Sequence, residues 1–230
     1  MIKTIGIMGG MGPLATNYFY SKIIEFTPAV KDQEHIPTII ISDPTVPDRT
    51  ACIQSGDYHL VEAKLLRMAQ LLESSNVEVL VMPCNTAHFF WNRIKSQVNL
   101  PFIDMIDATL EQVSGQDRIG LLATTGTIQS QLYQHYAKKY NIDIVVPSDS
   151  LQVVVMQAIM KIKSGVPGKQ VFELLGSVMS DFESNHVNTI IMGCTEVPLI
   201  FQDNLNDSLL DPMDILAKRV VQFALSDTEK

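Results

Sequence analysis

The chain has 230 residues, of which 46% are hydrophobic and 18% charged, as in a soluble globular protein with one large or two small domains. Its net charge of −8 at pH 7 argues against nucleic-acid binding, and no apolar segment approaches the ~18 residues that a membrane span needs. The N-terminus lacks the features of a signal peptide and the three cysteines are widely spaced, so we expect reduced thiols in a cytoplasmic protein, without disulfides or a metal site.

Strands and helices are predicted to alternate along the first half of the chain. The predicted strands are residues 4–8, 36–42, 77–82 and 101–105, and the predicted helices are residues 14–26, 57–74 and 85–97. A glycine-rich turn, GGMGP, follows the first strand, and a turn-rich segment ending in PDRT follows the second. Arg49 in PDRT is therefore predicted to lie in a loop.

The pattern restarts in the second half. Strands are predicted at residues 118–123, 143–146 and 189–192, and helices at residues 128–140, 151–163, 168–184 and 213–225. VEVLVMPC, which ends at Cys84, and VNTIIMGC, which ends at Cys194, stand at corresponding points of the two halves. This agreement indicates an internal duplication.

Buried strands without polar alternation favour parallel sheets with helices on both faces. We therefore predict an α/β fold of two pseudo-symmetric three-layer domains with largely parallel sheets and an active site in the interdomain cleft. The first domain is predicted to span residues 1–100, joined by a C-terminal helix at residues 212–226. The second is predicted to span residues 101–211.

Cys84 and Cys194 are the candidate catalytic residues. Each follows a buried strand, and parallel sheets bind ligands beyond the carboxyl ends of their strands. A lone buried cysteine is more often an inert core residue, which is how we interpret Cys52. Two equivalently placed thiols, in contrast, could face one substrate from opposite sides, which is what inversion of a stereocentre requires.

Polar residues beside the two cysteines are candidate substrate contacts, although each also fits an ordinary structural role. Asn85, Thr86 and Thr195 offer hydrogen-bonding groups next to the thiols, where they could equally cap helices. The first glycine-rich loop, with Met11, lets the backbone approach a small ligand closely. The corresponding loop of the second half offers the hydroxyls of Thr125 and Thr127.

For three charged or titratable residues, sequence spacing alone does not decide between a functional and a structural role. Arg49 could hold a carboxylate through two parallel hydrogen bonds, and Lys163 could simply be favoured at a helix end. His88, one helical turn after Cys84, could polarise the thiol or cap and pack. The pattern does not choose between these roles.

The segments MGGMGPLAT, PDRT, PCNTAH and GCTE, in this order, resemble the aspartate/glutamate racemase family, aspartate racemase branch. The resemblance covers essentially the whole chain. It implies Cys84 and Cys194 as the two bases, no pyridoxal phosphate, metal or other cofactor, and a homodimer. It further implies that the substrate is a small acidic amino acid.

The resemblance also implies how a substrate is held. Arg49, matched through PDRT, and Lys163, with Lys161 close by, would bind the side-chain carboxylate. The residues implied to meet the α-carboxylate or to lie beside the second base are Asn85, Thr86, Thr125, Thr127 and Thr195.

The resemblance therefore implies a cofactor-independent amino-acid racemase, with aspartate as the expected substrate. Related glutamate racemases carry Asp-Ser-Gly in the first loop and Gly-Cys-Thr-His at the second cysteine, whereas this chain has Gly9-Gly10-Met11 and Glu196. The alternatives are a racemase of broader specificity, a hydantoin racemase, and a non-catalytic protein that binds small carboxylates.

Overall fold

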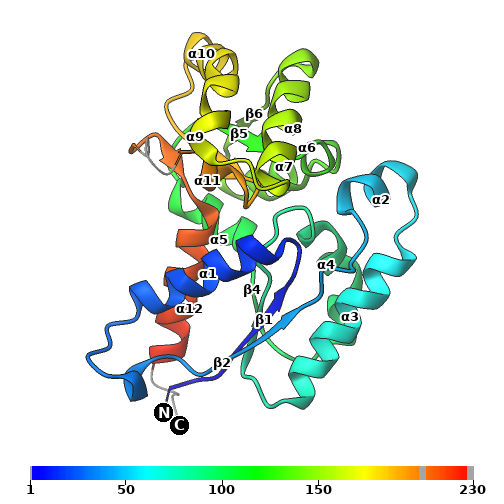
Figure 1. The fold of residues 1–230 in the computed structure, drawn as a ribbon, viewed down its shortest axis with the longest axis vertical. Helices are drawn as coiled ribbons and strands as arrows, with labels where there is room; N and C mark the ends of the chain where they lie inside the picture. The colour runs from blue at the N-terminus through cyan, green and yellow to red at the C-terminus, as the bar shows by residue number, and fades with distance from the viewer. Residues whose placement is uncertain (1, 202–205, 227–230) are drawn as a thin grey trace. The chain divides into compact units, whose positions relative to one another are not determined.

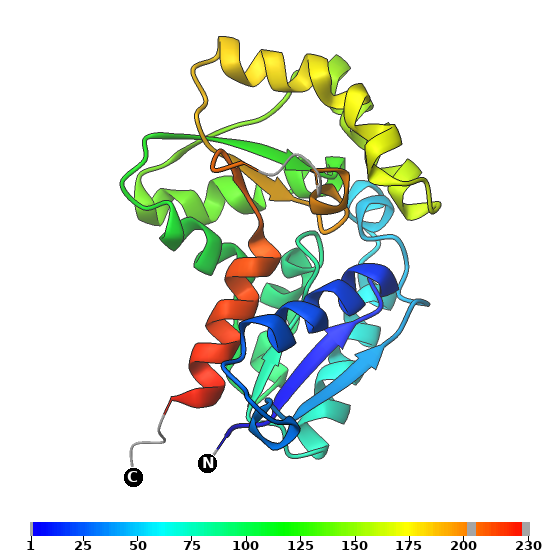
Figure 2. The same ribbon diagram turned by 60° about the vertical axis from the view of Figure 1, so that its left-hand side comes forward.

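The computed structural model describes residues 2–201 and 206–226 (Figures 1 and 2). The chain divides into two compact units, one formed by Met1–Thr109 with Met213–Lys230 and the other by Leu110–Pro212. Each unit contains one four-stranded sheet in which every pairing is parallel. The predicted α/β fold with two related halves is therefore confirmed.

The first unit has the strand order β2-β1-β3-β4. Its strands are β1 (Ile5–Gly9), β2 (Thr38–Ser42), β3 (Val79–Val81) and β4 (Phe102–Ile103). Its helices are α1 (Pro13–Phe26), α2 (Arg49–Ser55), α3 (His59–Ser74), α4 (His88–Ile94), α5 (Met105–Gln112), which extends into the second unit, and α12 (Pro212–Leu225). Because β1 is central, all five of its residues are buried.

Two hydrophobic clusters form the core of the first unit. One cluster includes Leu65 of α3 and Phe90 of α4. The other joins Phe19 of α1 to Val220 of α12, and these two helices lie side by side in both views (Figures 1 and 2). The last helix of the chain thus completes the core around the first strands.

Lys3 holds the C-terminal end of α12. Its Nζ donates hydrogen bonds to the carbonyls of Phe223 and Ser226 at 3.1 and 2.9 Å, where the helix dipole favours a cation. We expect Lys3→Met to lower the free energy of unfolding by about 1–2 kcal/mol. Lys31→Met, which removes an exposed lysine from a surface ion pair, is the control and should have little effect. Equal effects of the two substitutions on thermal unfolding would contradict this role for Lys3.

The second unit repeats the topology with the order β6-β5-β7-β8. Its strands are β5 (Arg118–Ala123), β6 (Asp143–Val145), β7 (Ile190–Gly193) and β8 (Leu209–Leu210). Its helices are α6 (Thr125–Gln129), α7 (Leu132–Ala137), α8 (Asp149–Lys163), α9 (Gly168–Val171), α10 (Gly176–Ser184) and α11 (Val197–Phe201).

The duplication extends to side-chain packing on the central strands. A Cβ atom added to Gly6 of β1 would lie 2.9 Å from Val77, and one added to Gly120 of β5 would lie 2.9 Å from Val187. These are the valines that open the two repeated cysteine segments. Equivalent glycines therefore admit equivalent valines in both units.

The structure corrects several predicted elements. Arg49 does not lie in a loop: it is the first residue of α2, which is capped by the Asp48 carboxylate accepting the N–H of Ala51. The helix predicted at residues 128–140 is broken into α6 and α7, because Gln131 adopts a left-handed conformation with φ of 52°. The segment predicted as one helix at residues 168–184 contains α9, a short 3₁₀ turn and α10.

Candidate active site

The first cysteine lies beyond the carboxyl end of β3, next to the glycine-rich loop that follows β1. β1 and β3 are paired in register from Ile5–Val79 to Ile7–Val81, so their carboxyl ends share one edge of the sheet. Cys84 is buried, with 5% exposure, and its N–H donates to the carbonyl of Met82. The thiol therefore sits in a tight turn at the edge where parallel sheets bind ligands.

His88 supports the turn that carries Cys84. Its Nδ1 lies 2.9 Å from the Cys84 carbonyl, and its Nε2 accepts the N–H of Met105 at 3.2 Å. Because Nε2 accepts, the proton is on Nδ1 and both ring nitrogens are occupied by main-chain groups. Of the two roles open from the sequence, the structure therefore supports capping and packing.

Asn85 and Thr86 are buried beside Cys84, with 2% and 6% exposure. They belong to the turn that precedes α4 rather than to the helix, since their carbonyls accept the N–H groups of His88 and Phe89. Both residues thus lie next to the thiol, as the sequence suggested.

Arg49 ties two loops of the first unit together. Its Nη1 donates to the carbonyls of Val46 and Pro47 at 3.2 and 3.0 Å, and its Nη2 donates to the carbonyl of Met11 at 3.3 Å. Its Nε is buried and has no hydrogen-bond partner within the described residues. The structure therefore joins Arg49 to Met11 and leaves the Nε N–H of Arg49 as a buried donor for a further acceptor.

In the second unit, the register Ala123–Gly193 places the loop after β5 beside the cysteine after β7. Thr124 caps α6: its Oγ1 accepts the N–H of Thr127 at 3.2 Å and lies 3.1 Å from the Thr127 hydroxyl. Thr127 is fully buried, and its hydroxyl is within hydrogen-bonding distance of the capping residue. Thr125 stands at the start of α6, and its Oγ1 accepts from Gln152 of α8 at 3.3 Å.

Helix α8 runs along this edge from the α6 loop toward the second cysteine. Gln152 also donates to the Ala123 carbonyl at 3.0 Å, and the Met156 sulfur lies 3.3 Å from the N–H of Thr125. A pocket of about 410 Å³ is lined here by residues that include Met156 and Met160. Sequence reasoning missed Gln152; the signal that could have found it is a glutamine within an otherwise apolar helical stripe.

Cys194, Thr195 and Glu196 form one buried cluster, and the exposed Lys163 lies at its edge. The Cys194 thiol donates to Glu196 Oε2 at 3.0 Å, and the Thr195 hydroxyl donates to the same oxygen at 3.2 Å. Lys163 Nζ lies 3.9 Å from Glu196 Oε1. Burial first, and then the Glu196 carboxylate, raise the pKa of Cys194 well above its ordinary value, and the Lys163 ammonium opposes this shift. From the sequence, Glu196 was noted only because glutamate racemases have a histidine at this position; its contact with Cys194 was not predicted.

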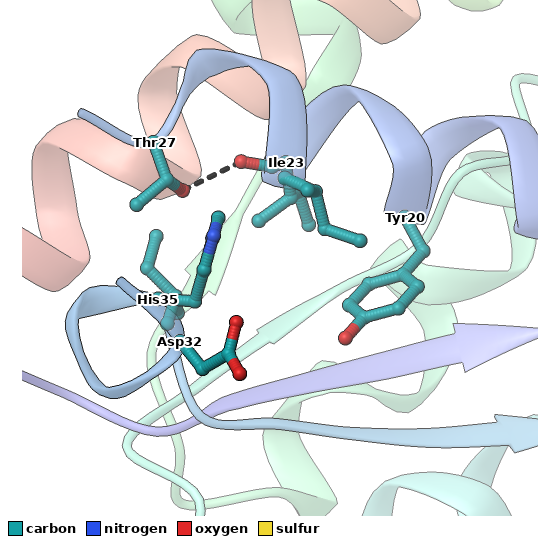
Figure 3. Close-up of a pocket in the computed structure, with 7 residues that line it drawn as sticks. Tyr20, Ile23, Thr27, Asp32 and His35 are labelled. Atoms are coloured by element: carbon teal, nitrogen blue, oxygen red, sulfur yellow. Dashed lines mark hydrogen bonds between the residues drawn. The ribbon is translucent and has the colours of Figure 1, made fainter. Parts of the chain in front are cut away.

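A second pocket, of about 290 Å³, lies in the first unit, at the amino end of β2 (Figure 3). Tyr20, Asp32 and His35 point toward it, and the Thr27 hydroxyl beside them donates to the Ile23 carbonyl. The pocket is at the opposite end of the strands from Cys84, so it does not belong to the candidate site.

Within residues 2–201 and 206–226, no group of three or more His, Cys, Asp or Glu side chains is arranged to hold a metal ion. Across the same residues, no helix combines the length and the apolar character needed to cross a membrane.

Comparisons with known proteins agree with the repeated architecture. Residues 8–220 match the family described as Asp/Glu/Hydantoin racemase. The chain is 29% identical to the broad specificity amino-acid racemase RacX of Bacillus subtilis (strain 168), with coverage of 96% of this chain and 98% of that protein.

Among solved structures, the Picrophilus torridus aspartate racemase aligns with a TM-score of 0.84 at 32% identity, over 96% of this chain and 94% of that one. An aspartate racemase homologue from Pyrococcus horikoshii OT3 aligns with a TM-score of 0.79 at 25% identity, over 97% and 100% of the two chains. The family match, the similarity over nearly full length and the shared fold establish that this chain belongs to the Asp/Glu/Hydantoin racemase family.

Proposed function

We propose that this amino-acid racemase interconverts L- and D-aspartate without a cofactor, with Cys84 and Cys194 as its two bases. The observation that carries the proposal is the placement of both thiols at equivalent carboxyl-edge positions of two duplicated sheets, one after β3 and one after β7. Inversion at an α-carbon needs a proton acceptor on one face and a donor on the other, and a duplicated fold supplies two such groups.

In the proposed reaction, one cysteine as thiolate removes the α-proton, and the C–H bonding electrons remain on the α-carbon. The other cysteine, as thiol, gives its proton to the opposite face of the carbanion, so the enantiomer forms and the thiol becomes a thiolate. The α-proton of an amino acid is weakly acidic, so donors around the α-carboxylate must stabilise the developing charge. We assign this role to Asn85 and Thr86 near Cys84 and to Thr125 and Thr195 near Cys194.

Aspartate is the proposed substrate because the Picrophilus torridus aspartate racemase is similar over nearly the whole chain. Two cations are available for its side-chain carboxylate. Arg49 has a buried Nε with no hydrogen-bond partner among the described residues. Lys163 lies beside Glu196, next to Cys194. Thr127 is assigned to the support of the α6 loop, and Met11 to the backbone contact with Arg49.

We expect Lys163→Met to raise KM for aspartate by about 10–100-fold, the effect of losing a hydrogen bond between charged groups. KM for alanine, which has no side-chain carboxylate, should change far less. Lys161→Met is the matched control, because Lys161 lies on the same helix two residues away. A larger rise in KM from the Lys161 substitution would transfer the role to that residue.

A racemase of broad specificity is the second candidate function. It is favoured by the similarity to RacX and by the pocket beside Thr125, where Met156 and Met160 offer adaptable apolar surface. Initial rates on L-aspartate, L-glutamate, L-methionine and a hydantoin distinguish the candidates. Comparable kcat/KM values for aspartate and methionine would favour broad specificity, whereas a strong preference for aspartate supports the first proposal.

We also propose that the protein works in the cytoplasm, which suits its free cysteines, and that it is a homodimer, as the resemblance to aspartate racemases implies. Sedimentation equilibrium of the purified protein tests the assembly: a mass of twice 25.6 kDa supports a dimer, and a single-chain mass opposes it.

A further inference from the structure

The second cysteine has an acidic neighbour that the first does not have at the corresponding position. Glu196 stands two residues after Cys194, whereas the residue two positions after Cys84 is the neutral Thr86. Cys194 and Glu196 are both almost fully buried, at 5% and 6% exposure, and are joined by the 3.0 Å hydrogen bond. The two thiols of the duplicated fold therefore differ in their electrostatic surroundings.

Three side chains lie next to the Glu196 carboxylate. The Cys194 thiol and the Thr195 hydroxyl both donate to Oε2, and Lys163 approaches Oε1 from the end of α8. Lys163 places a positive charge beside the carboxylate, and a carboxylate accepts a hydrogen bond from a thiol, whereas its negative charge repels a thiolate. The cluster therefore favours one protonation state of Cys194.

We propose that Glu196 is a positioning residue that keeps Cys194 as a protonated thiol between turnovers. The inference rests on the proposed two-thiol racemisation. Cys84 is then the thiolate that removes the α-proton in the first step, and Cys194 is the donor. The opposite enantiomer needs the reverse arrangement of protons, which Glu196 makes less populated.

Glu196 also favours the return of the proton to Cys194 after each inversion. Cys84 then carries the proton taken from the substrate, and Cys194 has become a thiolate beside a carboxylate. Because that pair of negative charges is unfavourable, Cys194 regains a proton from water while Cys84 releases one, and the resting state returns.

A direct test is a pH titration of single-cysteine variants, followed by the ultraviolet absorbance of the thiolate. In a Cys52→Ala, Cys84→Ala background, Glu196→Gln should lower the titration midpoint of Cys194 by about one pH unit or more, because it removes a like charge. In a Cys52→Ala, Cys194→Ala background, the same substitution should leave the Cys84 midpoint unchanged. An unchanged Cys194 midpoint would overturn the proposal. The titration uses no substrate, so its outcome is independent of whether the protein racemises aspartate.

Two further measurements separate the charge of Glu196 from its shape. Glu196→Asp, which keeps the charge, should give a Cys194 midpoint between those of the wild type and Glu196→Gln; equal shifts would reduce the role to packing and overturn the proposal. In the enzyme with all three cysteines, the basic limb of the pH profile of kcat/KM is expected to report the loss of the proton from the Cys194 thiol. Glu196→Gln should move that limb to lower pH, and an unmoved limb would also overturn the proposal.

Discussion

Replacing either Cys84 or Cys194 with alanine is expected to lower kcat for aspartate racemisation by about 10²–10⁴-fold, the contribution of one positioned acid or base. Neither thiol can replace the other, because inversion needs one group on each face of the α-carbon. The loss should therefore be similar for L- and D-aspartate as starting substrate. Chiral chromatography of timed reactions measures both directions.

Cys52→Ala is the matched control for the cysteine substitutions. Cys52 is a partly buried thiol in α2 that packs against the first core cluster, and it has no place in the proposed chemistry. Its removal should leave kcat and KM for aspartate unchanged. Full activity of Cys84→Ala in both directions would show that the two-base assignment is wrong.

Gly10→Ala is expected to lower the free energy of unfolding by about 2–5 kcal/mol, the sum of two effects. Gly10 has a φ of 91°, which costs an L residue about 1–2 kcal/mol. An added Cβ would also lie 2.4–2.6 Å from backbone atoms of Asp43, so one loop must move. The Gly10 N–H anchors its loop through Thr16 Oγ1 at 2.9 Å, and activity should fall with stability.

Gly56→Ala separates the two effects. Gly56 also has a positive φ, of 76°, but an added Cβ there meets nothing within 4 Å. Its substitution should therefore cost only about 1–2 kcal/mol. Thermal unfolding followed by circular dichroism compares the variants, and equal losses at the two glycines would contradict the close packing of the Gly10 loop against Asp43.

Much of the fold could be predicted because its signals are local. Buried β-branched strands, a glycine-rich turn and a long amphipathic helix such as α3 each carry their own pattern. The broken helices could not be predicted in the same way. Gln131 takes a left-handed conformation without the glycine that usually marks one, so the sequence around α6 and α7 gives the pattern of one continuous helix.

The candidate site was predictable in its residue types but less so in its contacts. The repeated segments pointed to Cys84 and Cys194 because the same strand pattern leads to each. The role of Arg49 depends on carbonyls of two loops, one of them at Met11, and no local pattern encodes such contacts. The bond between Glu196 and Cys194 likewise depends on the backbone turn after β7, which spacing alone does not fix.

The most direct test of the account is the incubation of L-aspartate with the purified protein in deuterium oxide. The two-base mechanism predicts that D-aspartate accumulates and carries deuterium at its α-carbon, because its proton comes from a thiol that exchanges with solvent. At early times the remaining L-aspartate should carry little deuterium, since the base that removed its proton is not the group that returns one. If no D-aspartate forms and the α-carbon acquires no deuterium, the protein is not an aspartate racemase.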